Sequence, residues 1–112
     1  MPHRKLLLDA LKNYITDYDS EVEFINETIT FVEENEDCFE RSNSAGHITG
    51  SVFLLSPDGK KVLLTHHKKL NRWLQLGGHS DGDSNTLNVA IREAKEESGI
   101  ENIIAVSKIF LI

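Results

Sequence analysis

The sequence lacks the features that would place the protein outside the cell or in a membrane. Its single cysteine, Cys38, has no second cysteine to pair with, which fits a reducing cytoplasm. No apolar run approaches the roughly 20 residues that a membrane-spanning helix needs. Asp9 and Lys12 interrupt the apolar stretch near the N-terminus, and no small-residue cleavage site follows it, so no signal peptide is expected. These absences predict a cytoplasmic protein with no membrane partner.

Basic residues are also scarce. The chain has 12 Lys and Arg against 18 Asp and Glu, a formal net charge of -6. Binding to nucleic acid backbones needs basic patches, so we expect no specific nucleic acid binding. An acidic protein that acts on a polyphosphate would need metal ions to bring the two together. Repeats are absent, and 112 residues suffice for one domain with a modest core.

The first 40 residues are predicted to form a helical extension, followed by a domain over 41–112. Apolar residues at three- and four-residue spacing predict an amphipathic helix over 4–18 and a second over 21–34. The second prediction is weaker, because Thr28 to Val32 are β-branched or aromatic. We expect this two-helix extension to pack on a core that the later residues build.

The middle of the chain is predicted to form strands. Residues 46–55 are nearly continuous in apolar character, so we expect a strand buried on both faces. Ser56-Pro57-Asp58-Gly59 is typical of a type I turn, and 61–67 would return as the second strand of a hairpin. A short strand over 73–76 then leads into Gly77 and Gly78.

A helix is expected to start near 84–86 and to stop at Gly99, which suits a left-handed position. Leu87, Ala90, Ile91 and Ala94 would form its apolar stripe. Residues 103–112 read as a further strand.

The same helix carries three acidic side chains on one face. Glu93, Glu96 and Glu97 fall within about a 100° arc, because residues three and four apart share a helix face. Like charges at this spacing repel by a few tenths of a kcal/mol. A hard divalent cation would turn that repulsion into binding. The alternative is a solvated acidic face, which leaves the preceding glycine loop unexplained.

The stretch Gly78–Ile100 resembles the Nudix box: Gly, five residues, Glu, seven residues, then Arg-Glu-apolar-any-Glu-Glu-any-Gly-apolar. Eight of the nine fixed positions match in register, namely Gly78, Arg92, Glu93, Ala94, Glu96, Glu97, Gly99 and Ile100. Ser84 stands at the position of the first Glu.

The resemblance implies an α/β fold, an α/β/α sandwich around a mixed sheet. The family normally continues with further strands and a closing helix, so the chain would be a fragment, or a partner chain such as a second copy in a homodimer would complete the sheet. It also implies hydrolysis of a pyrophosphate linkage in a small nucleoside diphosphate derivative. Glu93, Glu96 and Glu97 match the family's metal-binding and water-activating carboxylates, with Mg²⁺ as the cofactor and Mn²⁺ as an alternative. The carbonyl of Gly77 corresponds to a further ligand, and Arg92 to the arginine that orients the catalytic glutamate.

Several alternatives stay open. Ser84 can cap the helix, and Asp81 or Asp83 can supply the missing carboxylate. His66, His67 and His79 could join the glutamates in a transition-metal site, but adjacent strand residues face opposite sides; His79 is the best placed to line a pocket. Trp73 is expected to anchor the core rather than stack on a base. The competing functions are a Nudix-fold binding or sensor module and, more remotely, an isomerase that uses Cys38.

Overall fold

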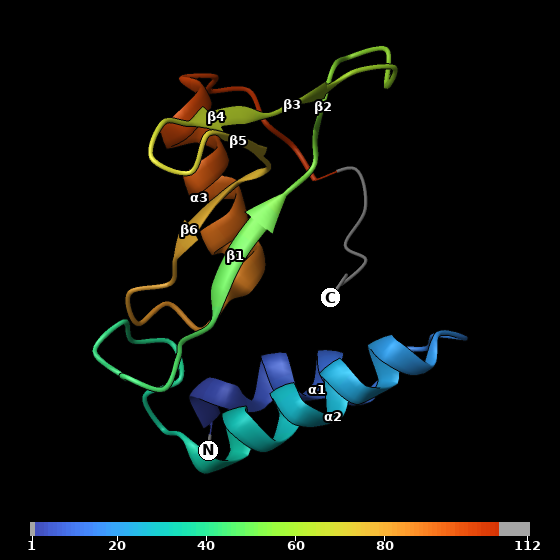
Figure 1. Ribbon diagram of the computed structural model, residues 1–112, viewed down its shortest axis with the longest axis vertical. Helices are drawn as coiled ribbons and strands as arrows, with labels where there is room; N and C mark the ends of the chain where they lie inside the picture. Colours follow the sequence, from blue (N-terminus) through green and yellow to red (C-terminus); the bar gives the residue numbers. More distant parts are fainter. Residues whose placement is uncertain (1, 106–112) are drawn as a thin grey trace.

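The computed structural model describes residues 2–105, in which helices and strands occupy separate segments (Figure 1). The helices are a 3-10 turn at Pro2–Arg4, α1 (Lys5–Lys12), α2 (Asp19–Glu34) and α3 (Thr86–Ser98). The strands are β1 (Thr49–Val52), β2 (Leu54–Leu55), β3 (Val62–Leu63), β4 (Thr65–His67), β5 (Arg72–Leu74) and β6 (Leu76–His79). At this level the content is that of an α/β protein, as predicted.

The first helix is shorter than its apolar pattern predicted. Leu7, Leu8 and Leu11 are buried, but α1 ends at Lys12, and Ile15 is 92% exposed. Residues 13–18 connect the helices instead, and Thr16 Oγ1 donates a 2.5 Å hydrogen bond to Glu21 of α2. Two β-branched residues in this stretch lower its helix propensity, and no burial of Ile15 compensates.

The second helix was predicted correctly, despite its β-branched residues. Helix propensities differ by only a few tenths of a kcal/mol per residue, whereas burial of one large apolar side chain contributes about 1.5–3 kcal/mol. Ile25 and Val32 are both buried, so packing outweighs propensity. The Thr28 hydroxyl donates to the carbonyl of Phe24 at 2.7 Å, a bond that a helical threonine can make within the helix.

Helices α1 and α2 lie side by side and enclose their own core (Figure 1). Its buried members are Leu7, Leu8, Leu11, Ile25, Val32, Cys38 and Phe39. The buried Arg4 guanidinium donates to the carbonyls of Val32 at 2.8 Å and Glu33 at 3.1 Å, which satisfies acceptors at the C-terminal end of α2. The extension therefore builds a core of its own, rather than packing on one that later residues supply.

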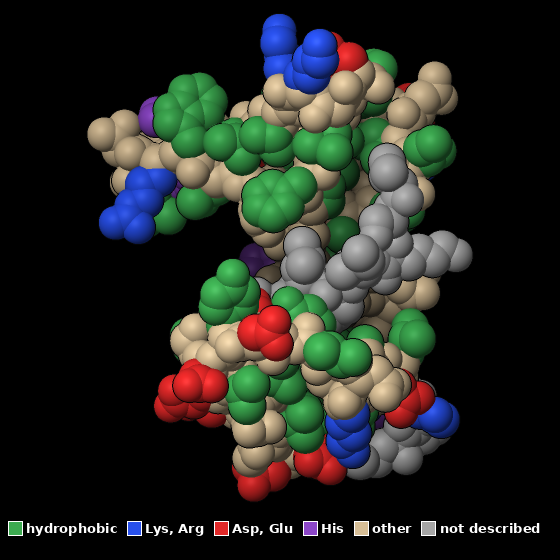
Figure 2. Space-filling view, turned by 90° about the vertical axis from the view of Figure 1, so that its right-hand side faces the viewer, with side chains coloured by type: hydrophobic (Ala, Val, Ile, Leu, Met, Phe, Trp, Pro, Cys, Tyr) green, Lys and Arg blue, Asp and Glu red, His purple; other side chains and the backbone are tan. Residues whose placement is uncertain are grey.

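The strands form three antiparallel pairs among the described residues: β1 with β6, β2 with β3, and β4 with β5. The turn over 56–59 closes the β2–β3 hairpin, as predicted. The stretch 46–55 is not one strand, because β1 and β2 pair with different partners. It is not buried on both faces either: Phe53 is 60% exposed, and Figure 2 shows apolar side chains at the surface of the upper part of the molecule.

Helix α3 covers one face of the β1–β6 pair, where the register places Gly50 opposite Gly78. A Cβ added at Gly50 would lie 2.8 Å from the carbonyl oxygen of Thr86, so glycine permits the close approach. Leu76, Val89, Ala90 and Ala94 are buried in this second core. Of the predicted apolar stripe, Leu87 is exposed and Val89 takes a core position.

Both ends of α3 are set by local side-chain and backbone geometry. Its N-cap is Asn85, whose side chain accepts a hydrogen bond from Asn88 N–H at 3.2 Å, so Ser84, which was considered as a cap, does not cap the helix. Gly99 has φ 73°, the left-handed conformation that was predicted. Of the strand predicted over 103–112, residues 103–105 are not in a strand, and the rest lies outside the described residues.

Candidate functional site

Glu93 lies against the backbone of β6. A Cβ added at Gly78 would stand 2.6 Å from the carboxyl carbon of Glu93 and 2.8 and 2.9 Å from its two oxygens. The Glu93 side chain is only 18% exposed. Glycine at position 78 therefore leaves the space that this carboxylate fills.

Glu97, one helical turn further on, reaches the neighbouring glycine. Its Oε1 accepts a hydrogen bond from the Gly77 N–H at 3.0 Å. Glu93 and Glu97, on the helix of the motif, thus meet its first residue, Gly78, and the residue directly before it, Gly77. The Glu96 side chain is exposed and makes no hydrogen bond or ion pair within residues 2–105.

The carboxylates suit a hard divalent cation by their chemistry, because Mg²⁺ and Mn²⁺ prefer oxygen ligands. The Glu93 and Glu97 carboxylates contact adjacent residues of β6, so the oxygens of both could bind one ion beside this strand. Within the described part of the chain, no three His, Cys, Asp or Glu side chains are already gathered as a metal-binding group.

Arg92 connects the acidic helix to the loop before it. Its Nη2 donates to the carbonyl oxygen of His79 at 2.9 Å and lies 3.6 Å from Glu93 Oε1, while Nη1 lies 3.9 Å from Asp83 Oδ2. One guanidinium thus touches the strand, the loop and the glutamate. This placement suits a residue that orients Glu93.

The two acidic residues considered as substitutes at Ser84 are held differently. Asp81 accepts two hydrogen bonds from Arg41, at 2.9 and 2.8 Å, and these bonds lower the pKa of its carboxyl. Asp83 is linked to Glu93 through Arg92, which forms an ion pair with each of them, and its Oδ1 also accepts from Asn85 N–H at 2.9 Å. Asp83 is therefore the better placed of the two.

The histidines are not grouped as the transition-metal alternative would require. His66 bonds Asn71, and His67 accepts from Leu70 N–H, so neither joins the glutamates. His79 instead meets His47, which sequence reasoning missed, with 2.9 Å between His47 Nε2 and His79 Nδ1. The pairing of β1 with β6 brings them together, because its register places Thr49, two residues after His47, opposite His79.

The expectation for Trp73 changes, and the surroundings of Cys38 bear on the remote isomerase alternative. Trp73 is 67% exposed beside the His66 ring, so it does not anchor the core. Its strand β5 pairs only with β4 among the described residues. Cys38 is buried in the helical core, and burial raises the pKa of its thiol, which disfavours a thiolate nucleophile.

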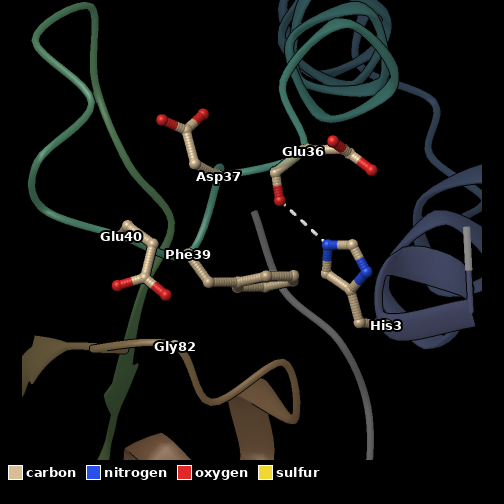
Figure 3. Close-up of a pocket in the computed structure, with 6 residues that line it drawn as sticks. All are labelled: His3, Glu36, Asp37, Phe39, Glu40 and Gly82. Atoms are coloured by element: carbon tan, nitrogen blue, oxygen red, sulfur yellow. Dashed lines mark hydrogen bonds between the residues drawn. The ribbon is translucent and has the colours of Figure 1, made fainter.

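A cavity of about 320 Å³ lies on the helical side of the glycine loop (Figure 3). It is lined by His3, Glu36, Asp37, Phe39, Glu40 and Gly82. His3 bonds the backbone carbonyl of Glu36 at 2.8 Å, as Figure 3 shows. None of the box glutamates lines this cavity, so it is separate from the candidate site.

Comparison with known protein families found no matching family, and comparison with curated proteins found no significant match. Within the described residues, no helix combines the length and apolar character needed to cross a membrane.

Proposed function

We propose that this chain is a Nudix-type hydrolase that cleaves a pyrophosphate linkage in a small nucleoside diphosphate derivative, with Mg²⁺ or Mn²⁺ as cofactor. The proposal includes the finer points of the resemblance: an α/β/α sandwich around a mixed sheet, a helical extension over 1–40 before a domain over 41–112, and a cytoplasmic location. The observation that carries it is the meeting of the two halves of the motif. Glu93 fills the space at Gly78, and Glu97 accepts from Gly77 N–H.

The chain's own groups have distinct parts in this reaction. Glu93, Glu96 and Glu97 would hold the metal, with the Gly77 carbonyl as a further ligand. The bound ion supplies charge neutralisation of the phosphates and activation of water. Gly77 N–H fixes the orientation of Glu97, and Arg92 that of Glu93. A water oxygen attacks one phosphorus, the anhydride P–O bond breaks, and one of the glutamates takes the water proton.

Hydrolysis is tested with a panel of nucleoside diphosphate derivatives. Purified protein is incubated with each compound and Mg²⁺ or Mn²⁺, and phosphate is measured after phosphatase treatment of the products. We expect turnover of at least one compound, abolished by a chelator and restored by added Mg²⁺. Absence of turnover across the panel with either ion, for protein that is folded by circular dichroism, would contradict the proposal.

A second candidate is a binding or sensor module of the same fold. It is favoured by Ser84, which puts a neutral side chain where the family motif has a carboxylate. Calorimetry that shows binding of a nucleoside diphosphate derivative, combined with no product formation, would favour this candidate over the hydrolase.

A further inference from the structure

The face of the β1–β6 pair opposite α3 carries two imidazoles in direct contact. Gly50 and Gly78 point toward α3, and side chains alternate along a strand, so His79 points to the other face. His47, two residues before Thr49, is a diagonal neighbour of His79 across the strands. Their ring centroids are 5.0 Å apart with an interplanar angle of 30°.

We propose that His47 and His79 form a two-nitrogen site for a transition-metal ion, Cu²⁺ or Ni²⁺. Their facing nitrogens, His47 Nε2 and His79 Nδ1, are 2.9 Å apart. Two imidazole nitrogens bound to one ion at about 2.0–2.1 Å, at a right angle, would also be about 2.9 Å apart. Tetragonal Cu²⁺ and Ni²⁺ favour such right angles, whereas a tetrahedral Zn²⁺ site would need a wider separation.

Neither ring needs to move far to accept an ion. His47 is partly exposed and His79 exposed, so small side-chain rotations would turn both lone pairs toward a shared ion and replace the present hydrogen bond. Water would complete the coordination, because no third such side chain is gathered there within the described residues. The site is thus an open chelate, not a closed structural site.

The charged side chains around the His47–His79 pair contribute little to metal binding, so an ion must bind through the imidazole nitrogens. Arg41 occupies both carboxylate oxygens of Asp81, the acidic side chain two residues after His79, and the guanidinium of Arg92 bonds the His79 carbonyl. The net negative charge near the pair is therefore small and attracts a cation only weakly. Imidazole nitrogen also disfavours Mg²⁺, which prefers oxygen ligands. This proposal is independent of the hydrolase, because Glu93 lies on the opposite face.

The test is electron paramagnetic resonance and calorimetry of the full chain with one equivalent of Cu²⁺. All proteins carry His3→Gln, since the N-terminal amine and His3 can bind Cu²⁺ by themselves. We expect one Cu²⁺ site with two nitrogen ligands. His47→Gln and His79→Gln should each lose at least about tenfold in Cu²⁺ affinity, because even residues that only orient a metal-binding side chain contribute about that much.

Two controls complete the test. The site should be kept in the double variant His66→Gln/His67→Gln, because those histidines bond Asn71 and Leu70 instead. It should also be kept in Glu93→Gln, because that carboxylate packs against Gly78 on the other face of the strand pair. Absence of a two-nitrogen signal in the parent protein would overturn the proposal, as would affinity that survives both single variants or disappears with the His66/His67 pair.

Discussion

Replacing Gly78 with alanine should separate catalysis from stability. The added Cβ would stand within 2.6–2.9 Å of the Glu93 carboxyl group, closer than Cβ atoms in real structures approach other atoms. The backbone accepts alanine, because Gly78 is not among the positive-φ residues. The obstacle is the far end of a flexible side chain, so Glu93 rotates away at a stability cost within about 1 kcal/mol.

The displaced carboxylate should then reduce turnover strongly. A misplacement of about 1 Å can lower a rate on the order of 100-fold, and the loss should be at least of that size. The assay is kcat/KM on the best compound of the panel, together with urea unfolding.

Gly50→Ala is the matched control. Its Cβ would meet backbone atoms of Thr86 and Ala90 and the Val89 side chain at 2.8–3.0 Å; the backbone atoms cannot rotate aside, and the Val89 side chain is fully buried. Overpacking of this kind costs about 1–3 kcal/mol, so Gly50→Ala should lose stability. Wild-type turnover in Gly78→Ala, or a stability loss equal to that of Gly50→Ala, would refute the reasoning.

Three further predictions concern the scaffold. Asn85→Ala should lower the free energy of unfolding by about 1 kcal/mol through loss of the N-cap of α3, whereas Ser84→Ala should change it by less than about 0.5 kcal/mol; equal effects in urea unfolding would contradict the capping assignment. Leu11→Ala, at a side chain that is 1% exposed, should cost about 2–5 kcal/mol in the same assay, and a smaller loss would argue against the helical core. Hydrogen bonds from Arg41 lower the pKa of Asp81, so the stability that this pair contributes should be present at neutral pH and lost as the pH falls through the lowered pKa. Carboxyl NMR should show the Asp81 pKa rising in Arg41→Gln, and no change would contradict the pairing.

The sequence predicted elements best where local signals and packing agree. The Gly99 stop and the turn at 56–59 each follow from residue types that match their surroundings, whereas the second helix forms because packing outweighs the low helix propensity of its β-branched residues. The first helix failed beyond Lys12 because apolar spacing alone cannot tell whether Ile15 has anything to pack against. Periodicity gives the face of a helix, but burial decides its length.

Strand pairing was harder to predict, because it depends on residues far apart in the chain. The apolar run over 46–55 indicated one buried strand, yet β1 pairs with β6 and β2 with β3. The same limit hid the contact between His47 and His79, which are 32 residues apart. The contacts of Glu93 and Glu97 with Gly78 and Gly77, in contrast, join residues that the motif already groups.

The most direct test of the central proposal is kcat/KM with Mg²⁺ for Glu97→Gln. Glutamine can still accept the Gly77 N–H bond, so the variant removes the charge and keeps the contact. Glu101→Gln, an exposed carboxylate past the end of α3, is the control. We predict a loss of at least about 100-fold, roughly 2.7 kcal/mol of transition-state stabilisation, in Glu97→Gln alone, with both variants unfolding at the same temperature. Wild-type kcat/KM in Glu97→Gln would contradict the assignment of this face as the active site.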